Sequence, residues 1–159
     1  MFITDFITKV ESSESYKEFI KNHPDYYLVH LFCMQPDENW QAGYYSEKED
    51  KIVIFSGTPV MNSTEEDSFK KQGIIHPLPI NEITIDADKA IQLAEQAKNT
   101  KHSAETINKK IIILQIIEQP VWNITLISDS FSMINIRIHA KTGETLRIKA
   151  DSILSLGKK

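Results

Sequence analysis

Residues 121–148 read VWNITLISDSFSMINIRIHAKTGETLRI, and this stretch decides the fold. Within it, Trp122, Ile124 and Leu126 alternate with polar residues, and the alternation returns over residues 133–139. Because successive side chains of a β-strand point to opposite faces of the sheet, this period of two is typical of strands with one buried and one hydrated face. The sequence therefore predicts an antiparallel meander whose polar side is, in the simplest interpretation, ordinary hydrated surface.

Turn-forming residues divide this stretch into three strands. A three-residue loop at 128–130 keeps the apolar side chains of the first two strands on one face, since a slip of one residue would place apolar opposite polar side chains. This loop pairs Asn123 with Asn135.

The second turn follows the same logic. A loop at 141–143 pairs Ile136 with Ile148 and Ile138 with Leu146. Its third residue is a glycine, at the position where three-residue hairpin loops take a left-handed conformation, which glycine adopts without a steric penalty.

A helix is predicted ahead of the meander. Asp86 is a good N-cap, and small apolar residues follow it at helical spacing up to residue 97. A strand over 110–118 separates this helix from the meander. The second half of the chain is thus a helix followed by antiparallel strands.

The first half repeats this order more loosely. Ser15 and Glu18 form a capping-box pattern at the start of a helix. Strands are predicted over 26–34, from Trp40 onward, and over 51–55. Each half carries a tryptophan at the start of the strand that follows its first long strand, which indicates an internal duplication.

The predicted fold class is α+β, with two helix-plus-antiparallel-sheet units in tandem, each of the order α-β-β-β. The first unit spans residues 1–57 and the second spans 83–159. A connector rich in Pro, Ser, Thr and acidic residues, 58–82, joins them and is expected to hold one short helix near 67–72. Residues 2–10 have apolar side chains at helical spacing and are expected to form an extra helix that closes one end of the core.

The second half resembles the PepSY family, small modules in which one helix packs on an antiparallel sheet, as in cystatin-like folds. The matching segments are DADKAIQLAEQA at 86–97, VWNITLI at 121–127 and IHAKTGETL at 138–146, and the resemblance covers residues 83–150. It implies an activity of binding or inhibition, with no catalytic residues to carry over.

Composition excludes several classes of partner. The formal net charge is −4 and the basic residues are scattered, so no nucleic-acid partner is expected. No apolar run approaches the roughly 20 residues that cross a bilayer, so no membrane span is expected. The N-terminal residues lack the basic region of a secretory signal and the chain has one cysteine, so a cytoplasmic location is expected, or a secreted or periplasmic one if a leader was removed.

No arrangement of residues in the sequence indicates catalysis. Cys33 and His30 are three apart, and an odd spacing on a strand sends the two side chains to opposite faces, so Cys33 is interpreted as a small buried residue. The remaining histidines lack zinc-ligand spacing, and no glycine-rich phosphate loop occurs. We therefore expect no enzyme, no metal and no cofactor.

Two groups of residues are candidates for binding a partner. They are the aromatic residues Trp40, Tyr44 and Tyr45 of the first half, and the polar residues Asn123, Asn135 and Arg137 of the meander. Since Tyr44 and Tyr45 take opposite faces, one of them is expected to be exposed. Burial in the core is the competing interpretation of the aromatic group.

The function predicted from the sequence is a non-catalytic binding or regulatory module for a peptide or protein partner, held at a sheet edge or on the polar face of the meander. The alternative function is a small hydrolase or lyase with a pocket between helix and sheet. The open sheet edges could also join copies of the chain into a homo-oligomer.

Overall fold

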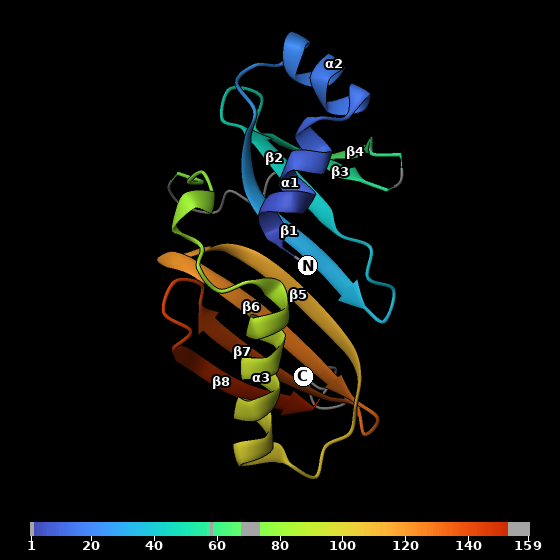
Figure 1. The fold of residues 1–159 in the computed structure, drawn as a ribbon. Helices are drawn as coiled ribbons and strands as arrows, with labels where there is room; N and C mark the ends of the chain where they lie inside the picture. The colour runs from blue at the N-terminus through green and yellow to red at the C-terminus, as the bar shows by residue number, and fades with distance from the viewer. Residues whose placement is uncertain (1, 58, 68–73, 153–159) are drawn as a thin grey trace.

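The computed structural model describes residues 2–57, 59–67 and 74–152 of the chain (Figure 1). The first half contains the helices α1 (Ile3–Glu11) and α2 (Glu14–Asn22) and the strands β1 (Tyr27–Gln35), β2 (Gln41–Ser46), β3 (Lys51–Ser56) and β4 (Met61–Asp67). A short 3-10 helix, η1 (Ile80–Glu82), leads into α3 (Ala87–His102). The strands β5 (Ile107–Ile117), β6 (Gln119–Ser128), β7 (Ser132–His139) and β8 (Thr145–Ser152) follow.

All eight strands belong to one antiparallel sheet in the order β4-β3-β2-β1-β5-β6-β7-β8. The central ladder pairs β1 with β5, and Leu31 lies opposite Leu114. The prediction of two helix-plus-sheet units in tandem is therefore wrong, because this ladder joins the strands of both halves into one sheet. The physical reason is that β1 and β5 are long and apolar, and an unpaired edge on either would leave its backbone groups without partners.

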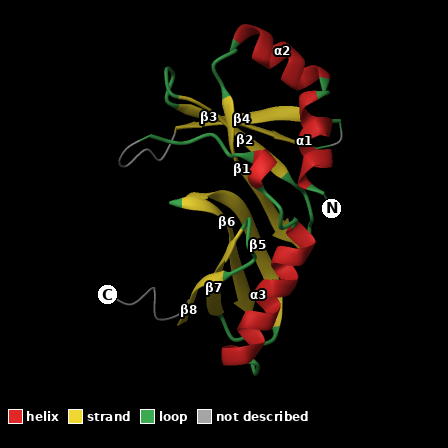
Figure 2. Ribbon diagram, turned by 60° about the vertical axis from the view of Figure 1, so that its left-hand side comes forward, coloured by secondary structure: helices red, strands yellow, loops and turns green. Residues whose placement is uncertain are grey.

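The α-helices lie on one face of this sheet (Figure 2). α2 packs on β2 and β3 through aromatic rings, since Tyr16 and Phe19 both contact Phe55. α3 contributes Ala90 and Ala94 to the same buried core. Helices and strands of both halves therefore share one hydrophobic core. We call the opposite face, which carries His30, Phe32, Ile113 and Asn123, the distal face.

Two contacts tie the halves together on the helix side. The rings of Trp40 and Trp122 meet edge to face, with centroids 6.3 Å apart. Asp86 is the N-cap residue of α3 as predicted, but its side chain makes no capping hydrogen bond to that helix. Its carboxylate instead accepts a hydrogen bond of 2.9 Å from the backbone N–H of Ile3, at the start of α1. A carboxylate at that end of a helix is favourable because it faces the positive end of the helix dipole.

The β6–β7 hairpin keeps the predicted faces but shifts the predicted pairs. Ile124 lies opposite Ile136, whereas Asn123 lies opposite Arg137, so the predicted pair of Asn123 with Asn135 is wrong. The loop falls one residue later than predicted because Ser128 remains in β6, where its hydroxyl accepts a hydrogen bond from the backbone N–H of Ser132.

The β7–β8 hairpin is closer to the prediction. Ile136 pairs with Ile148 as expected, but a bulge places Ile138 opposite Thr145 rather than opposite Leu146. Gly143 has φ +80°, which confirms the left-handed conformation predicted for that position.

The predicted connector, 58–82, is more structured than expected, because β4 (Met61–Asp67) extends the sheet within it. The short helix expected near residues 67–72 lies outside the described residues, apart from Asp67, which ends β4. The helix expected over residues 2–10 is confirmed by α1, which buries Ile3, Phe6, Ile7 and Val10.

Replacing Gly143 with valine should destabilise the protein by about 1 kcal/mol or more, because a β-branched residue is strained at positive φ. A Cβ at this position would also lie 3.4 Å from Cδ1 of Ile85 and of Leu93. Urea denaturation measures the change. Gly143→Asn is the matched variant and should cost less, since asparagine tolerates this conformation better. Equal losses for both variants would contradict a conformational origin.

Replacing Trp122 with alanine should cost about 3–5 kcal/mol of unfolding free energy, as for a large aromatic residue removed from a core. Trp122 is fully buried, and its indole N–H donates a 2.7 Å hydrogen bond to the carbonyl of Ile85. Asn135→Ala, on the distal face, should cost only about 1 kcal/mol for its lost hydrogen bonds. Denaturant titrations of the two variants check the contrast, and similar losses would show that the assignment of faces is incorrect.

Candidate functional site

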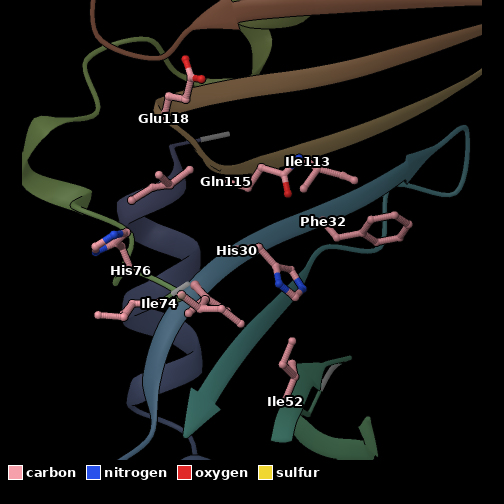
Figure 3. Close-up of a pocket in the computed structure, with 11 residues that line it drawn as sticks. His30, Phe32, Ile52, Ile74, His76, Ile113, Gln115 and Glu118 are labelled. Atoms are coloured by element: carbon pink, nitrogen blue, oxygen red, sulfur yellow. The ribbon is translucent and has the colours of Figure 1, made fainter. Parts of the chain in front are cut away.

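A cavity of about 550 Å³ lies on the distal face, at the seam between the two halves. Figure 3 shows His30 and Phe32 extending into it from β1, and Ile113 and Gln115 from β5. Its walls come from β1, β3, β5, the residue after β5 and the segment before η1: Val29, His30, Phe32, Ile52, Ile74, Ile75, His76, Ile113, Gln115, Ile116 and Glu118. Most of these side chains are apolar, with a few polar groups among them.

A bulge in β1 determines which side chains reach the cavity. The register of β1 against β2 shifts between Leu28 and His30. Because of this extra residue, Leu28 and Leu31 both join the core on the helix side. His30 and Phe32 therefore face the cavity on the distal side.

His30 is held in place by a glycine on the neighbouring strand. Its imidazole covers Gly43, where a Cβ would lie only 2.2 Å from Cε1 of the ring. A side chain at residue 43 would thus push the ring away. Burial lowers the pKa of His30, which favours the neutral imidazole at neutral pH.

Hydrogen bonds to β1 hold one wall of the cavity. The hydroxyl of Tyr27 donates to the carbonyl of Ile75 at 2.6 Å. The backbone N–H of Leu78 donates to the carbonyl of Leu28 at 2.8 Å. The segment that carries Ile74, Ile75 and His76 is thereby fixed beside the sheet, although Ile74 itself remains largely exposed.

The aromatic candidates do not line this cavity. Trp40 is half-buried on the helix side, where its ring contacts Phe6 and Trp122. Tyr44 is buried on the same side and donates a 3.0 Å hydrogen bond from its hydroxyl to Glu11. Tyr44 and Trp40 are thus parts of the core.

The prediction that one of the two tyrosines is exposed is wrong. Tyr45 does take the opposite face from Tyr44, but it is also buried. Its ring meets the ring of Tyr27 edge to face, with centroids 5.8 Å apart, and its hydroxyl donates to Asp50 at 2.8 Å. The turn after β2 and the neighbouring strand therefore cover a face that was expected to be hydrated.

The polar candidates do gather on the distal face. Asn123, Asn135 and Arg137 are each half-buried. The amide of Asn135 donates to Oδ1 of Asn123 at 2.7 Å and to the hydroxyl of Thr125 at 3.1 Å. Asn123 lies opposite both Ile113, which lines the cavity, and Arg137. Asn123 and Arg137 therefore continue the row of side chains that starts at Ile113, but they do not line the cavity itself.

Sequence reasoning missed His30, Phe32, Ile113 and Gln115 as site residues. The available signal was Gln115, a polar residue within the otherwise apolar run of β5. The alternation within each strand correctly indicates that these residues share a face, but it does not reveal that β1 and β5 are neighbours.

Cys33 is buried, as predicted. It pairs with the core residue Ile112, whereas His30 faces the distal cavity, so the predicted separation of Cys33 and His30 is confirmed. Burial raises the pKa of the Cys33 thiol to about 11, which leaves little reactive thiolate at neutral pH.

The side chains that line the cavity are mostly apolar. The described residues that line it include imidazole, amide and carboxyl groups, but no hydroxyl or thiol that a neutral His30 could activate. Over residues 2–57, 59–67 and 74–152, no group of three or more His, Cys, Asp or Glu side chains is placed to hold a metal ion. Apolar walls with a few polar groups are typical of sites that hold an apolar group in a fixed orientation.

No protein-family model matches this chain, and no curated protein matches it either. Among solved structures, the chain is similar to a protein of Clostridium difficile 630 described as a "putative lipoprotein". The TM-score is 0.57 at 15% sequence identity, over 85% of this chain and 89% of the other. The likeness therefore concerns the fold and extends over most of both chains. Within the described residues, no helix is long and apolar enough to cross a membrane.

The half-buried imidazole of His30 should make the stability of the protein depend on pH. The pKa of His30 is lower in the folded protein than in the unfolded chain. When the pH falls below about 6.5, the unfolded chain therefore takes up a proton at His30 before the folded protein does. The free energy of unfolding decreases over this range, until the pH reaches the pKa of the folded state. Above about 6.5 this contribution is fully present. The free energy of unfolding, measured at about pH 8 and about pH 5, should fall less in His30→Gln than in the wild type. Gln115→Asn, at the wall of the same cavity, changes no ionisable group and is the control that should keep the wild-type difference. An unchanged difference in His30→Gln would contradict the effect of burial on His30.

Proposed function

We propose that this protein is a non-catalytic binding module that holds an extended segment of a peptide or protein partner on the distal face of the sheet. An apolar side chain of the partner occupies the cavity beside β1 and β5. The observation that carries this proposal is the cavity itself, about 550 Å³ of mostly apolar wall on the face that the α-helices leave uncovered.

Burial of apolar surface supplies the attraction. Phe32, Ile52 and Ile113 are half-buried, so part of each side chain remains in contact with water. Covering apolar surface contributes roughly 25 cal/mol per Å². The neutral form of His30 favours an uncharged group beside it, because no charge on the imidazole requires a counterion.

The polar residues next to the cavity favour a peptide as the occupant. Asn135 donates hydrogen bonds to Asn123 and Thr125, and the remaining donor and acceptor groups of these three side chains can hydrogen-bond to a peptide backbone. The resemblance of residues 83–150 to PepSY modules supports the same proposal, since that family is associated with binding and inhibition.

We also propose that the protein acts outside the cytoplasm, in the cell envelope or as a secreted protein. The fold that it shares with a "putative lipoprotein" supports this location over the cytoplasmic one expected from the sequence. Immunoblotting of fractionated source cells tests it. The protein is expected with the envelope or the medium, and recovery in the cytosolic fraction alone would contradict the proposal.

The binding proposal is tested in two steps. Peptides that bind the full chain are first selected from a library of displayed random nonapeptides. Their affinities are then measured for a variant in which a substitution fills the cavity. Ile113→Trp places a large ring in the cavity and should weaken the selected peptides at least about tenfold, since burial of one aliphatic side chain is worth about 1.5–3 kcal/mol. Fluorescence polarisation measures the affinities.

Ile127→Trp is the matched control. It makes the same substitution on β6, at a residue that does not line the cavity, and should leave the affinities unchanged. Thermal unfolding verifies that both variants are folded. Failure to select any peptide, or equal effects of the two substitutions, would reject the proposed function.

A further inference from the structure

One row of side chains crosses five strands of the distal face, from β1 to β8. Phe32 lies opposite Ile113, which lies opposite Asn123. Asn123 in turn lies opposite Arg137, and Arg137 opposite Arg147. Directly opposed residues of neighbouring strands share a face. The row therefore begins at the apolar cavity and ends at two cationic side chains.

These two residues are the only arginines in the sequence, which has 18 Lys and Arg residues in total. Like charges at directly opposed positions destabilise a sheet unless something neutralises them. Among the described residues, no hydrogen bond or ion pair engages either guanidinium, and Nε of Arg137 is buried without a partner. A buried donor of this kind is costly until an acceptor reaches it.

The choice of arginine indicates the kind of acceptor. A guanidinium is planar and presents several N–H groups in a fixed fork that matches the two oxygens of a carboxylate. Lysine, the cation used everywhere else in this chain, lacks that geometry. An oxyanion placed between Arg137 and Arg147 would neutralise both charges and accept from the unpartnered Nε.

We infer that the partner is an acidic peptide, with a carboxylate side chain bound between Arg137 and Arg147 and an apolar side chain in the cavity. This inference rests on the proposed function. It specifies the charge of the partner and the position of that charge relative to the apolar side chain.

The spacing of the strands sets the spacing of the two side chains in the peptide. Neighbouring strands lie about 4.8 Å apart, so Arg137 is about 10 Å and Arg147 about 14 Å from Ile113 along the row. In an extended peptide, residues i and i+4 point to the same side and are about 13 Å apart. An acidic residue four positions from the apolar residue therefore reaches the gap between the two arginines.

A fatty acid also combines an apolar body with a carboxylate, but the surface between the cavity and the arginines disfavours it. Asn123 lies between Ile113 and Arg137, and Thr125 and Asn135 lie in the neighbouring row. Their amide and hydroxyl groups would lose water beneath a hydrocarbon chain and gain no hydrogen bond from it. The backbone of a peptide supplies donors and acceptors at those positions.

The test uses fluorescein-labelled peptides of serine and threonine that contain one leucine and, one to six residues after it, one glutamate. Each peptide has a twin with glutamine in place of the glutamate. Fluorescence polarisation with the full chain should show the tightest binding at a spacing of four, with the glutamine twin at least about tenfold weaker.

The double variant Arg137→Gln/Arg147→Gln should bind the glutamate peptide no better than its glutamine twin. Its control, Lys89→Gln/Lys101→Gln, removes the same charge from exposed residues of α3 and should retain the preference. Thermal unfolding of the arginine variant should show no loss of stability, because the opposed charges are gone.

Two outcomes would overturn the inference and spare the proposed function. One is binding that Ile113→Trp weakens but that is equal for the glutamate and glutamine peptides. The other is a preference for glutamate that persists in the double arginine variant.

A lipid occupant would give a different result. Dodecanoate would then bind more tightly than every peptide, and its binding would be lost in the arginine variant, which would reject the peptide. If Ile113→Trp changes no affinity, the proposed function fails as well.

Discussion

The pairing of β1 with β5 is the constraint on which the rest of the structure depends. Five residue pairs, from Leu31 with Leu114 to Gln35 with Lys110, join the strands of the two halves. Without this ladder each half would expose a long apolar edge strand, and such edges recruit other chains. With it, one core forms beneath the α-helices. The distal cavity also depends on it, since His30 and Phe32 come from β1, and Ile113 and Gln115 come from β5.

The uneven distribution of helices leaves the distal face as the surface on which we propose that a partner binds. The α-helices cover one face of the sheet and bury its apolar rows there, from Phe55 to Ile138. The distal face carries mixed side chains that are mostly half-buried by their neighbours. Its apolar part lies over the central ladder and its cationic part lies at β7 and β8. Such a row would offer the proposed extended partner several spaced contacts, whereas a closed pocket selects one compact group.

Features that depend on neighbours in sequence could be predicted. The alternation around Trp122 and Ile136 gave the buried face of the meander, and Gly143 gave the second turn. The local rules failed at the loop between β6 and β7, because loops at 128–130 and at 129–131 both keep the apolar side chains on one face. This loop lies one residue later than predicted because the hydroxyl of Ser128 accepts a hydrogen bond within the later turn. The later turn forms even though it places Phe131 at φ +62°, a conformation that is unfavourable for phenylalanine.

Features that depend on distant segments could not be predicted from one sequence. Nothing in β1 indicates that β5 is its neighbour, and without that pairing the cavity residues belong to separate strands. The same holds for Asp86, whose side chain binds the N-terminus of a helix 83 residues earlier in the chain. The pair of arginines was recognisable by composition, but only the register of β7 with β8 places them opposite each other.

Native-state hydrogen exchange of the backbone amides in β1 and β5 tests the single sheet most directly. If the ladder joins both halves into one cooperative unit, its hydrogen-bonded amides should exchange only through global unfolding. These are the amides between Leu31 and Gln35 and those of their partners in β5. Their free energy of exchange should equal that of the amides at the centre of β6. Rapid exchange at this ladder, with separate protection of the two halves, would contradict the account.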